Sequence, residues 1–90
     1  MDHSSSEQGF QILATRSFER SLKKLSMDIQ KRILKKLEEL EVNPFKGRRL
    51  RGNPGVLYIR IGKFRVFYKV NEQEKTVNII NVSHRRSAYR

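Results

Sequence analysis

The side chains in this sequence that could take part in chemistry are basic and aromatic, and they follow one another in two segments of alternating polarity. Tyr58 and Arg60 alternate with apolar residues in the first segment, and Arg65, Phe67 and Lys69 do so in the second. Because side chains two residues apart point to the same face of a strand, each set is expected to share a face. Arginine donates paired hydrogen bonds to phosphate, and aromatic rings stack on bases. The pattern therefore indicates a surface for single-stranded RNA.

An arginine cluster of this kind also permits a reaction. When a 2′-hydroxyl attacks its own phosphodiester, a doubly charged phosphorane forms, and fixed cationic donors stabilise it. The chain has no cysteine, and the acidic side chains of its second half are Glu72 and Glu74, which share one predicted turn. Two-metal nucleases need several converging carboxylates, which this half lacks. We therefore expect chemistry that uses arginine, lysine, tyrosine and His84, the histidine of the predicted folded region, with no metal and no cofactor.

The net charge of +11 is concentrated in the second half of the chain. Residues 1–45 carry eight basic and seven acidic side chains, whereas residues 46–90 carry twelve basic and two acidic ones. Such a field predicts a polyanionic partner: nucleic acid, a membrane surface or an acidic protein. A membrane fits poorly, because the basic residues lie among predicted strands and loops and not on an amphipathic helix. With no apolar run that could span a bilayer and no signal peptide, we expect a cytoplasmic protein that binds no membrane.

The spacing of apolar residues predicts the elements that position these side chains. Residues 1–9 are polar and are expected to form a disordered leader, and residues 10–14 are expected to form a strand. Apolar residues then recur every three or four positions and predict a short helix, a break at 26–28 and a longer helix. They are Phe18, Leu22 and Leu25, followed by Ile29, Ile33, Leu37 and Leu40. The charged outer face of the longer helix is interpreted as solvated surface.

The second half of the chain is predicted to be mostly strand. Residues 45–55 are basic and rich in turn residues, and a period of two then predicts strands at 57–61, 65–70 and 76–83. The pair Ile79-Ile80 interrupts the alternation, which is interpreted as a central strand covered on both faces. Residues 10–90 are therefore expected to form one small α+β domain of order β-α-α-β-β-β. In this domain two N-terminal helices pack on a mainly antiparallel sheet.

Several segments together resemble the RelE/ParE toxin superfamily, and the resemblance covers residues 10–90. The segments are 50–55 (LRGNPG), 58–68 (YIRIGKFRVFY) and 82–89 (VSHRRSAY), with Thr15-x-x-Phe18-x-x-x-Leu22 near the start. The resemblance implies a type II toxin, a metal-independent endoribonuclease that enters the ribosomal A site and cuts the mRNA codon there, so that translation stops. It also implies a cognate antitoxin that holds the toxin inactive and through which the complex binds operator DNA.

The resemblance implies roles for individual residues as well. Arg60 matches a basic strand residue at the scissile region, and Arg65 matches the arginine that stabilises the transition state. Arg85 matches an arginine that stabilises phosphate or protonates the leaving group, and Tyr89 matches a tyrosine that orients the substrate. Tyr58 stands where the best-known RelE toxin has a lysine, so the proton acceptor at that position is not carried over.

The identity of the proton acceptor therefore stays open. A tyrosine with its ordinary pKa near 10 is a poor base at neutral pH, whereas an ordinary histidine titrates close to it. His84 is the local candidate for this role, although a structural, hydrogen-bonded histidine is the alternative reading. Other residues of the basic half are expected to bind RNA: Tyr58, Lys63, Arg48, Arg49, Arg51 and Arg86.

Two other functions remain compatible with the sequence. A ParE-like protein of the same fold inhibits DNA gyrase and has no nuclease activity, and a shared fold cannot choose between the two. The joint presence of Arg60, Arg65, Arg85 and Tyr89 favours the nuclease. A basic module that binds RNA or the ribosome without catalysis would show a steep dependence of binding on salt and would leave the RNA uncut.

Overall fold

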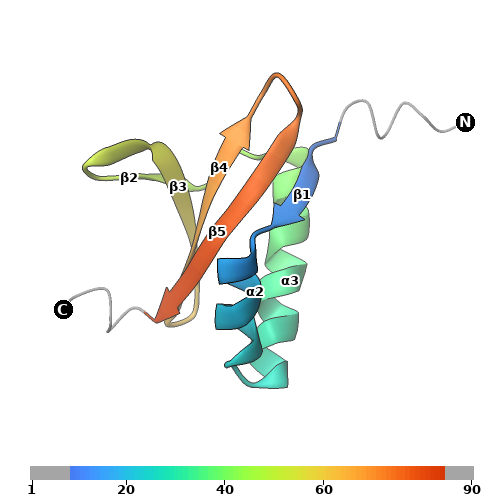
Figure 1. The fold of residues 1–90 in the computed structure, drawn as a ribbon, viewed down its shortest axis with the longest axis vertical. Coiled ribbons are helices and arrows are strands. Elements are labelled where there is room, and N and C mark those ends of the chain that lie inside the picture. Colours follow the sequence, from blue (N-terminus) through green and yellow to red (C-terminus); the bar gives the residue numbers. More distant parts are fainter. Residues whose placement is uncertain (1–8, 85–90) are drawn as a thin grey trace, which may run out of the picture.

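A five-stranded mixed sheet and two helices make up the computed structural model, which describes residues 9–84 (Figure 1). Along the chain the elements are β1 Gln11–Ala14, α2 Arg16–Lys23, α3 Met27–Val42, β2 Arg48–Leu50, β3 Asn53–Ile61, β4 Phe64–Asn71 and β5 Thr76–His84. The strand order is β1-β5-β4-β3-β2, with β1 parallel to β5 and the other pairs antiparallel. The predicted fold class, a small α+β domain with two helices on a mainly antiparallel sheet, is confirmed.

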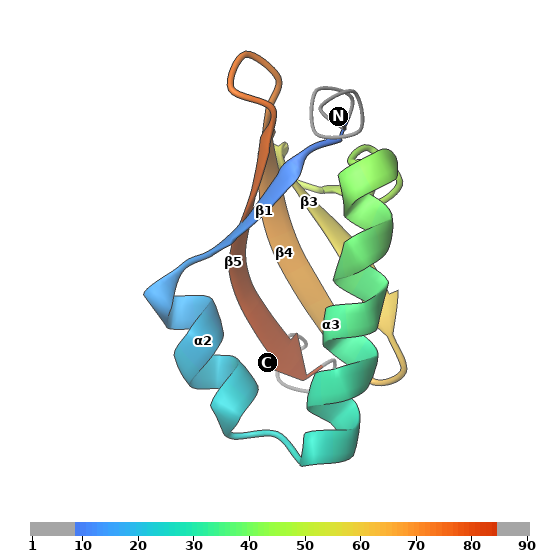
Figure 2. The same cartoon turned by 90° about the vertical axis from the view of Figure 1, so that its right-hand side faces the viewer.

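Both helices cover the same face of the sheet, where α2 packs against β5 and α3 against β1 and β3 (Figures 1 and 2). Thr15 caps α2 and Ser26 caps α3, and in each case the side-chain oxygen accepts a hydrogen bond from the backbone N–H three residues later. The second helix ends just before Asn43-Pro44, because the residue before a proline disfavours the helical conformation.

The hydrophobic core lies between the helices and the sheet. The predicted apolar stripes of the helices supply Phe18, Leu22, Ile33, Leu37 and Leu40, and the strands supply Leu57, Ile59, Ile61, Val66, Tyr68, Val77, Ile79 and Val82. Because alternate residues of β3 and β4 face this core, the residues between them face the opposite side of the sheet. None of the helices and strands in residues 9–84 covers that second face (Figure 1). We call it the open face.

One strand was not predicted from the sequence. Residues 48–50, within the stretch interpreted as turn-rich, form β2 and pair antiparallel with β3. Two features account for this strand. The hydroxyl of Tyr68 donates a hydrogen bond to the carbonyl oxygen of Pro44 and accepts one from the N–H of Gly47, each at 2.9 Å, which ties the preceding loop to β4. Gly52, with φ of 87°, then supplies the tight turn from β2 into β3.

The interrupted alternation in β5 has a different cause from the one expected. Phe67 and Tyr68, which are neighbours in β4, pair with Asn81 and Ile79, so Ile80 is an extra residue in β5. This β-bulge shifts the phase of the alternation, and residues on both sides of it can therefore face the core. The expectation that β5 is covered on both faces is wrong, because both helices lie on one side of the sheet (Figure 2).

Some predictions fall on residues that the structure does not describe. The leader predicted at 1–9 lies outside the described range except for Gly9, and Arg85, Arg86 and Tyr89 follow the end of that range. Within residues 9–84, no helix is long and apolar enough to cross a membrane.

Candidate nucleic-acid interface

A two-residue turn sets the register of the strands that carry the candidate site. Gly62 adopts φ of 60°, a conformation that glycine accepts readily, and the turn joins β3 to β4. In this register Arg60 lies directly opposite Arg65, and Tyr58 lies directly opposite Phe67. Residues directly opposite one another share a face. Because the residues between them are buried in the core, these four side chains lie together on the open face, as predicted.

Arg65 and two aromatic rings form a stacked group on this face. The guanidinium carbon of Arg65 lies 5.0 Å from the centroid of the Tyr58 ring, a cation–π arrangement. The Tyr58 and Phe67 ring centroids are 5.9 Å apart, with the ring planes tilted by 53°. All three side chains are half-buried. The group therefore holds a cation in a fixed position beside aromatic surface on which a base can stack.

The hydrogen bonding of Arg65 is incomplete. Its Nε atom is buried and has no hydrogen-bond partner among the described residues. A buried donor without an acceptor is unfavourable, so the site has a preference for an acceptor. Arg60 is exposed and lies directly opposite Arg65 on the neighbouring strand, where it adds a second positive charge. Like charges directly opposite one another repel. A phosphate between the two arginines would supply the acceptor and reduce the repulsion.

The exposed basic residues predicted to bind RNA are distributed along β3. Arg48, on β2, lies directly opposite Tyr58 and shares the open face with it. Arg49 lies opposite Leu57, a core residue, so the Arg49 side chain is on the helix side of the sheet. Arg51 and Lys63 lie in the turns at the two ends of β3. The structure therefore brings Arg48 next to the stacked group and places the other three farther along the strand pair.

The residue that positions β2 was not singled out from the sequence as part of the site. Tyr68 is fully buried, and burial raises its pKa above the ordinary value, an effect that the hydrogen bond from Gly47 partly opposes.

A Cβ atom added to Gly47 would lie 2.5 Å from the Tyr68 hydroxyl oxygen and 2.6 Å from the carbonyl oxygen of Tyr58. This close approach requires glycine. A tyrosine at a core-facing strand position is the signal that could have indicated such a link, since a buried hydroxyl needs a partner.

The structure does not bring His84 to Arg65. His84 lies directly opposite Phe64, and their ring centroids are 5.1 Å apart at an interplanar angle of 79°. Ser83 is the residue opposite Arg65. Because successive strand residues alternate between faces, His84 lies on the helix side of the sheet and Ser83 on the open face. His84 therefore does not share the open face with Arg65, and its role as proton acceptor stays a prediction.

Three further candidate residues lie outside the described range. Arg85, Arg86 and Tyr89 lie beyond the described residues, so their roles stay predictions. Within residues 9–84, no three His, Cys, Asp or Glu side chains gather into a group that could hold a metal ion.

Comparisons with known proteins agree with the fold. A family model described as the ParE toxin of the type II toxin–antitoxin system parDE matches residues 12–89. A curated protein of Methanocaldococcus jannaschii, named "Putative toxin RelE1", is 34% identical over 87 residues, and the alignment covers 74% of this chain and 97% of that protein.

Solved structures with the same fold include two toxin–antitoxin complexes. A chain of the RelBE2 complex from Mycobacterium tuberculosis superposes with a TM-score of 0.78 at 28% identity, covering 86% of this chain and 99% of that one. A chain of the RelB–RelE complex from Methanococcus jannaschii gives a TM-score of 0.69 at 28% identity, covering 86% and 94%. Since the family model spans nearly the whole chain and these relatives share its fold, the protein belongs to the RelE/ParE superfamily of type II toxin–antitoxin toxins.

Proposed function

We propose that this toxin is a ribosome-dependent endoribonuclease that cuts mRNA at the codon in the A site and so inhibits translation. The observation that carries the proposal is the stacked group on the open face, where Arg65 lies over Tyr58 with its buried Nε atom lacking an acceptor. Phosphate is the acceptor that matches a guanidinium in charge and geometry, and the neighbouring rings suit the bases of a single strand.

The proposed reaction is an intramolecular transesterification. The 2′-oxygen forms a bond to the adjacent phosphorus as the bond to the 5′-oxygen breaks, which leaves a 2′,3′-cyclic phosphate and a 5′-hydroxyl. The 2′-hydroxyl gives up one proton, and the departing 5′-oxygen takes one. Negative charge grows on the non-bridging oxygens in between, where Arg65 and Arg60 would donate hydrogen bonds. This chemistry needs no metal ion, because the arginines provide the positive charge.

The proposal assigns the remaining steps to residues near the end of the chain. Arg85 would stabilise the phosphate or protonate the 5′-oxygen, and Tyr89 would orient the substrate. Because His84 lies opposite Phe64 on the helix side of the sheet, the group that accepts the proton of the 2′-hydroxyl stays open. The basic residues along β3 and β2 would hold the message on either side of the cut. Arg86 would also bind the RNA, next to Arg85 in the sequence.

A cognate antitoxin is part of the same proposal. The RelBE2 structure from Mycobacterium tuberculosis and the RelB–RelE structure from Methanococcus jannaschii are both toxin–antitoxin complexes. A protein of net charge +11 would be held inactive by an acidic or amphipathic antitoxin segment that covers or displaces the basic site. Operator DNA would then be bound by the complex through the antitoxin, in the cytoplasm where the ribosome also lies.

Primer extension on a defined mRNA tests the nuclease. The protein is added to programmed ribosomes and, separately, to the same message without ribosomes. Cuts confined to the A-site codon and seen only with ribosomes are expected, and an uncut message would contradict the proposal. Because EDTA dismantles ribosomes, independence of metal is tested separately on a short RNA at high protein concentration.

A second function is favoured by one observation: the matching family model carries the ParE name. In this alternative the protein binds DNA gyrase and inhibits it without cutting RNA. A supercoiling assay with purified gyrase distinguishes the two. Gyrase that keeps full activity in an excess of the protein removes the alternative, whereas inhibited gyrase together with uncut mRNA would replace the first proposal by the second.

A further inference from the structure

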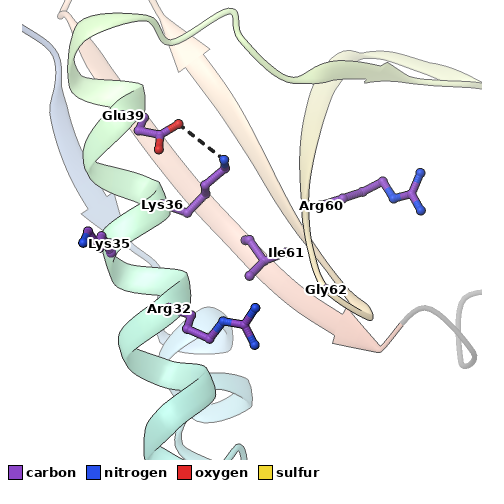
Figure 3. Close-up of a pocket in the computed structure, with 7 residues that line it drawn as sticks. All are labelled: Arg32, Lys35, Lys36, Glu39, Arg60, Ile61 and Gly62. Atoms are coloured by element: carbon purple, nitrogen blue, oxygen red, sulfur yellow. Dashed lines mark ion pairs between the residues drawn. The ribbon is translucent and has the colours of Figure 1, made fainter.

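A groove runs between α3 and the end of β3 that β2 leaves unpaired. The pairing of β2 reaches only Tyr58, so residues 59–61 of β3 have no strand partner on this side within the described part of the chain. A hollow of about 380 Å³ lies here, lined by Arg32, Lys35, Lys36, Glu39, Arg60, Ile61 and Gly62 (Figure 3). A second hollow of about 210 Å³ shares Lys36 and Arg60 with the first and extends to Lys46, Gly47, Arg48, Tyr58 and Ile59.

The walls of this groove are strongly cationic. Six basic residues line the two hollows, three from α3 and three from the strand side: Arg32, Lys35, Lys36, Lys46, Arg48 and Arg60. The acidic residue among the lining residues is Glu39, which pairs with Lys36 at 3.5 Å and also contacts Lys46. In Figure 3 Arg32 and Lys36 extend toward the β3 side, whereas Lys35 points away from it and the Arg60 side chain points from β3 away from α3. The helix surface that was expected to be solvated therefore borders a groove whose lining is mostly basic.

Arg32 and Lys36 place two like charges next to each other on the groove side of α3. They lie one helical turn apart on α3, and like charges at that spacing disfavour the free helix. Arg60 and Arg48 belong both to the groove and to the strand pair that carries the candidate site, so the two surfaces are continuous. A polyanion in the groove would therefore reach the edge of the open face.

The chemistry of the groove favours a nucleic-acid backbone over a protein segment. The exposed large apolar residues of the described chain are Leu13, Met27, Leu34, Val42 and Phe45, and none of them lines either hollow. The apolar lining residues Ile59 and Ile61 are only 6% and 8% exposed. A protein partner would thus find little apolar surface to bury, whereas phosphates would find Arg32 and Lys36 on the helix side and Arg60 and Arg48 at the strand rim.

The same lining favours a duplex over a single strand. Single-stranded RNA is held largely by bases that stack on aromatic rings, whereas an RNA duplex is recognised by its shape, phosphates and 2′-hydroxyls. Among the described lining residues Tyr58 is the aromatic one, and its ring is already in contact with Arg65 and Phe67. We propose that the groove between α3 and β3 binds the sugar–phosphate backbone of double-stranded RNA. The choice of RNA rests on the function proposed above, and the groove would hold structured RNA beside the strand to be cut.

Binding to an RNA duplex of about 16 base pairs tests this proposal without ribosomes or cleavage. The double variant Arg32→Ala/Lys36→Ala is compared with the wild type over a range of salt concentrations by fluorescence anisotropy. Loss of two phosphate contacts is expected to weaken duplex binding about tenfold and to lower the slope of log K against log salt by about 2. The matched control is Arg20→Ala/Lys31→Ala, which removes one arginine and one lysine from exposed helix positions that line neither hollow. The control should bind nearly as the wild type does.

Each other result overturns the proposal. If the two double variants lose the same amount of duplex affinity, only the net charge of the protein matters and not the groove. If duplex binding is unchanged in Arg32→Ala/Lys36→Ala, the groove takes no part in RNA recognition. A synthetic oligoglutamate peptide is measured in parallel, and loss of peptide binding with unchanged duplex binding would assign the groove to an acidic protein. Tighter, groove-dependent binding to the same duplex made of DNA would replace RNA as the ligand. If the wild type cuts no ribosome-bound message, the proposed function fails, but the duplex measurement still decides what the groove binds.

Discussion

Arg65 reaches Tyr58 from a diagonal position on the neighbouring strand, with its guanidinium carbon 5.0 Å from the ring centroid. The residue directly opposite Tyr58 is Phe67, two positions after Arg65 in β4. The stack therefore depends on the register of the β3–β4 hairpin. A slip of one residue would move Arg65 to the core side of the sheet, where the helices lie. The two-residue turn at Gly62 thus fixes the position of the cation as well as the strand pairing.

Replacement of Arg65 by alanine is expected to lower the rate of ribosome-dependent cleavage by about 10²-fold or more, on the scale of one lost transition-state donor. Arg65→Lys keeps the charge but loses the planar pair of donors, so only a small part of the rate should return. Single-turnover cleavage on programmed ribosomes measures both variants. Arg20→Ala, an exposed arginine of α2, is the control and should cut at the wild-type rate. Wild-type cleavage by Arg65→Ala would show that the stacked group is not the catalytic centre.

Tyr58 offers a test that separates its ring from its hydroxyl. Tyr58→Phe keeps the ring that contacts Arg65 and Phe67, so we expect cleavage within a few-fold of the wild type. Tyr58→Ala removes a cation–π contact of about 0.5–2 kcal/mol and should slow cleavage about tenfold. The same single-turnover assay reads both variants. A loss in Tyr58→Phe as large as that in Tyr58→Ala would assign a direct chemical role to the hydroxyl.

Most elements of the fold could be predicted because their signals are local. The stripes from Phe18 to Leu22 and from Ile33 to Leu40 each depend on residues a few positions apart. The alternation in β3 and β4 likewise placed the basic side chains on one face. These features need no knowledge of distant contacts.

The features that were missed depend on contacts between distant segments. β2 forms where the loop from Pro44 to Gly47 meets the hydroxyl of Tyr68, a contact across more than 20 residues that a local pattern cannot reveal. The bulge at Ile80 is visible only in the pairing of β4 with β5. The same bulge decides which residues near the end of β5 face Arg65, so the placement of His84 could not be derived from strict alternation alone.

Gly47 should be the glycine whose replacement is least tolerated among those that lack a positive φ. In Gly47→Ala the new Cβ would meet the Tyr68 hydroxyl and the carbonyl oxygen of Tyr58, and the free energy of unfolding should fall by about 1–3 kcal/mol. Gly55→Ala is the matched control, because the nearest atom to its added Cβ lies at 4.0 Å, and its stability should change by less than about 0.5 kcal/mol. Urea unfolding of both variants measures the difference. Equal stabilities would mean that the loop before β2 can move away from Tyr68 at no cost.

The raised pKa of Tyr68 implies that the free energy of unfolding changes at alkaline pH. Burial raises the pKa of Tyr68 above its ordinary value near 10, so the unfolded chain loses this proton at a lower pH than the folded protein. Below about pH 10 both states keep the proton and Tyr68 contributes no pH dependence. Above it the unfolded state binds fewer protons, and the free energy of unfolding falls by up to about 1.4 kcal/mol per pH unit until the folded pKa is passed.

The variant Tyr68→Phe isolates this effect, because every other titrating group is shared with the wild type. At neutral pH the variant should be less stable by about 1–3 kcal/mol, since the hydroxyl hydrogen bonds to Pro44 and Gly47 are lost. As the pH rises above about 10, the wild type should lose this advantage and the two stabilities should converge. Urea unfolding at a series of pH values measures the gap. A gap that stays constant through the alkaline range would show that Tyr68 titrates in the folded protein as it does in the unfolded chain, and that its hydroxyl is not held in the buried link to β2.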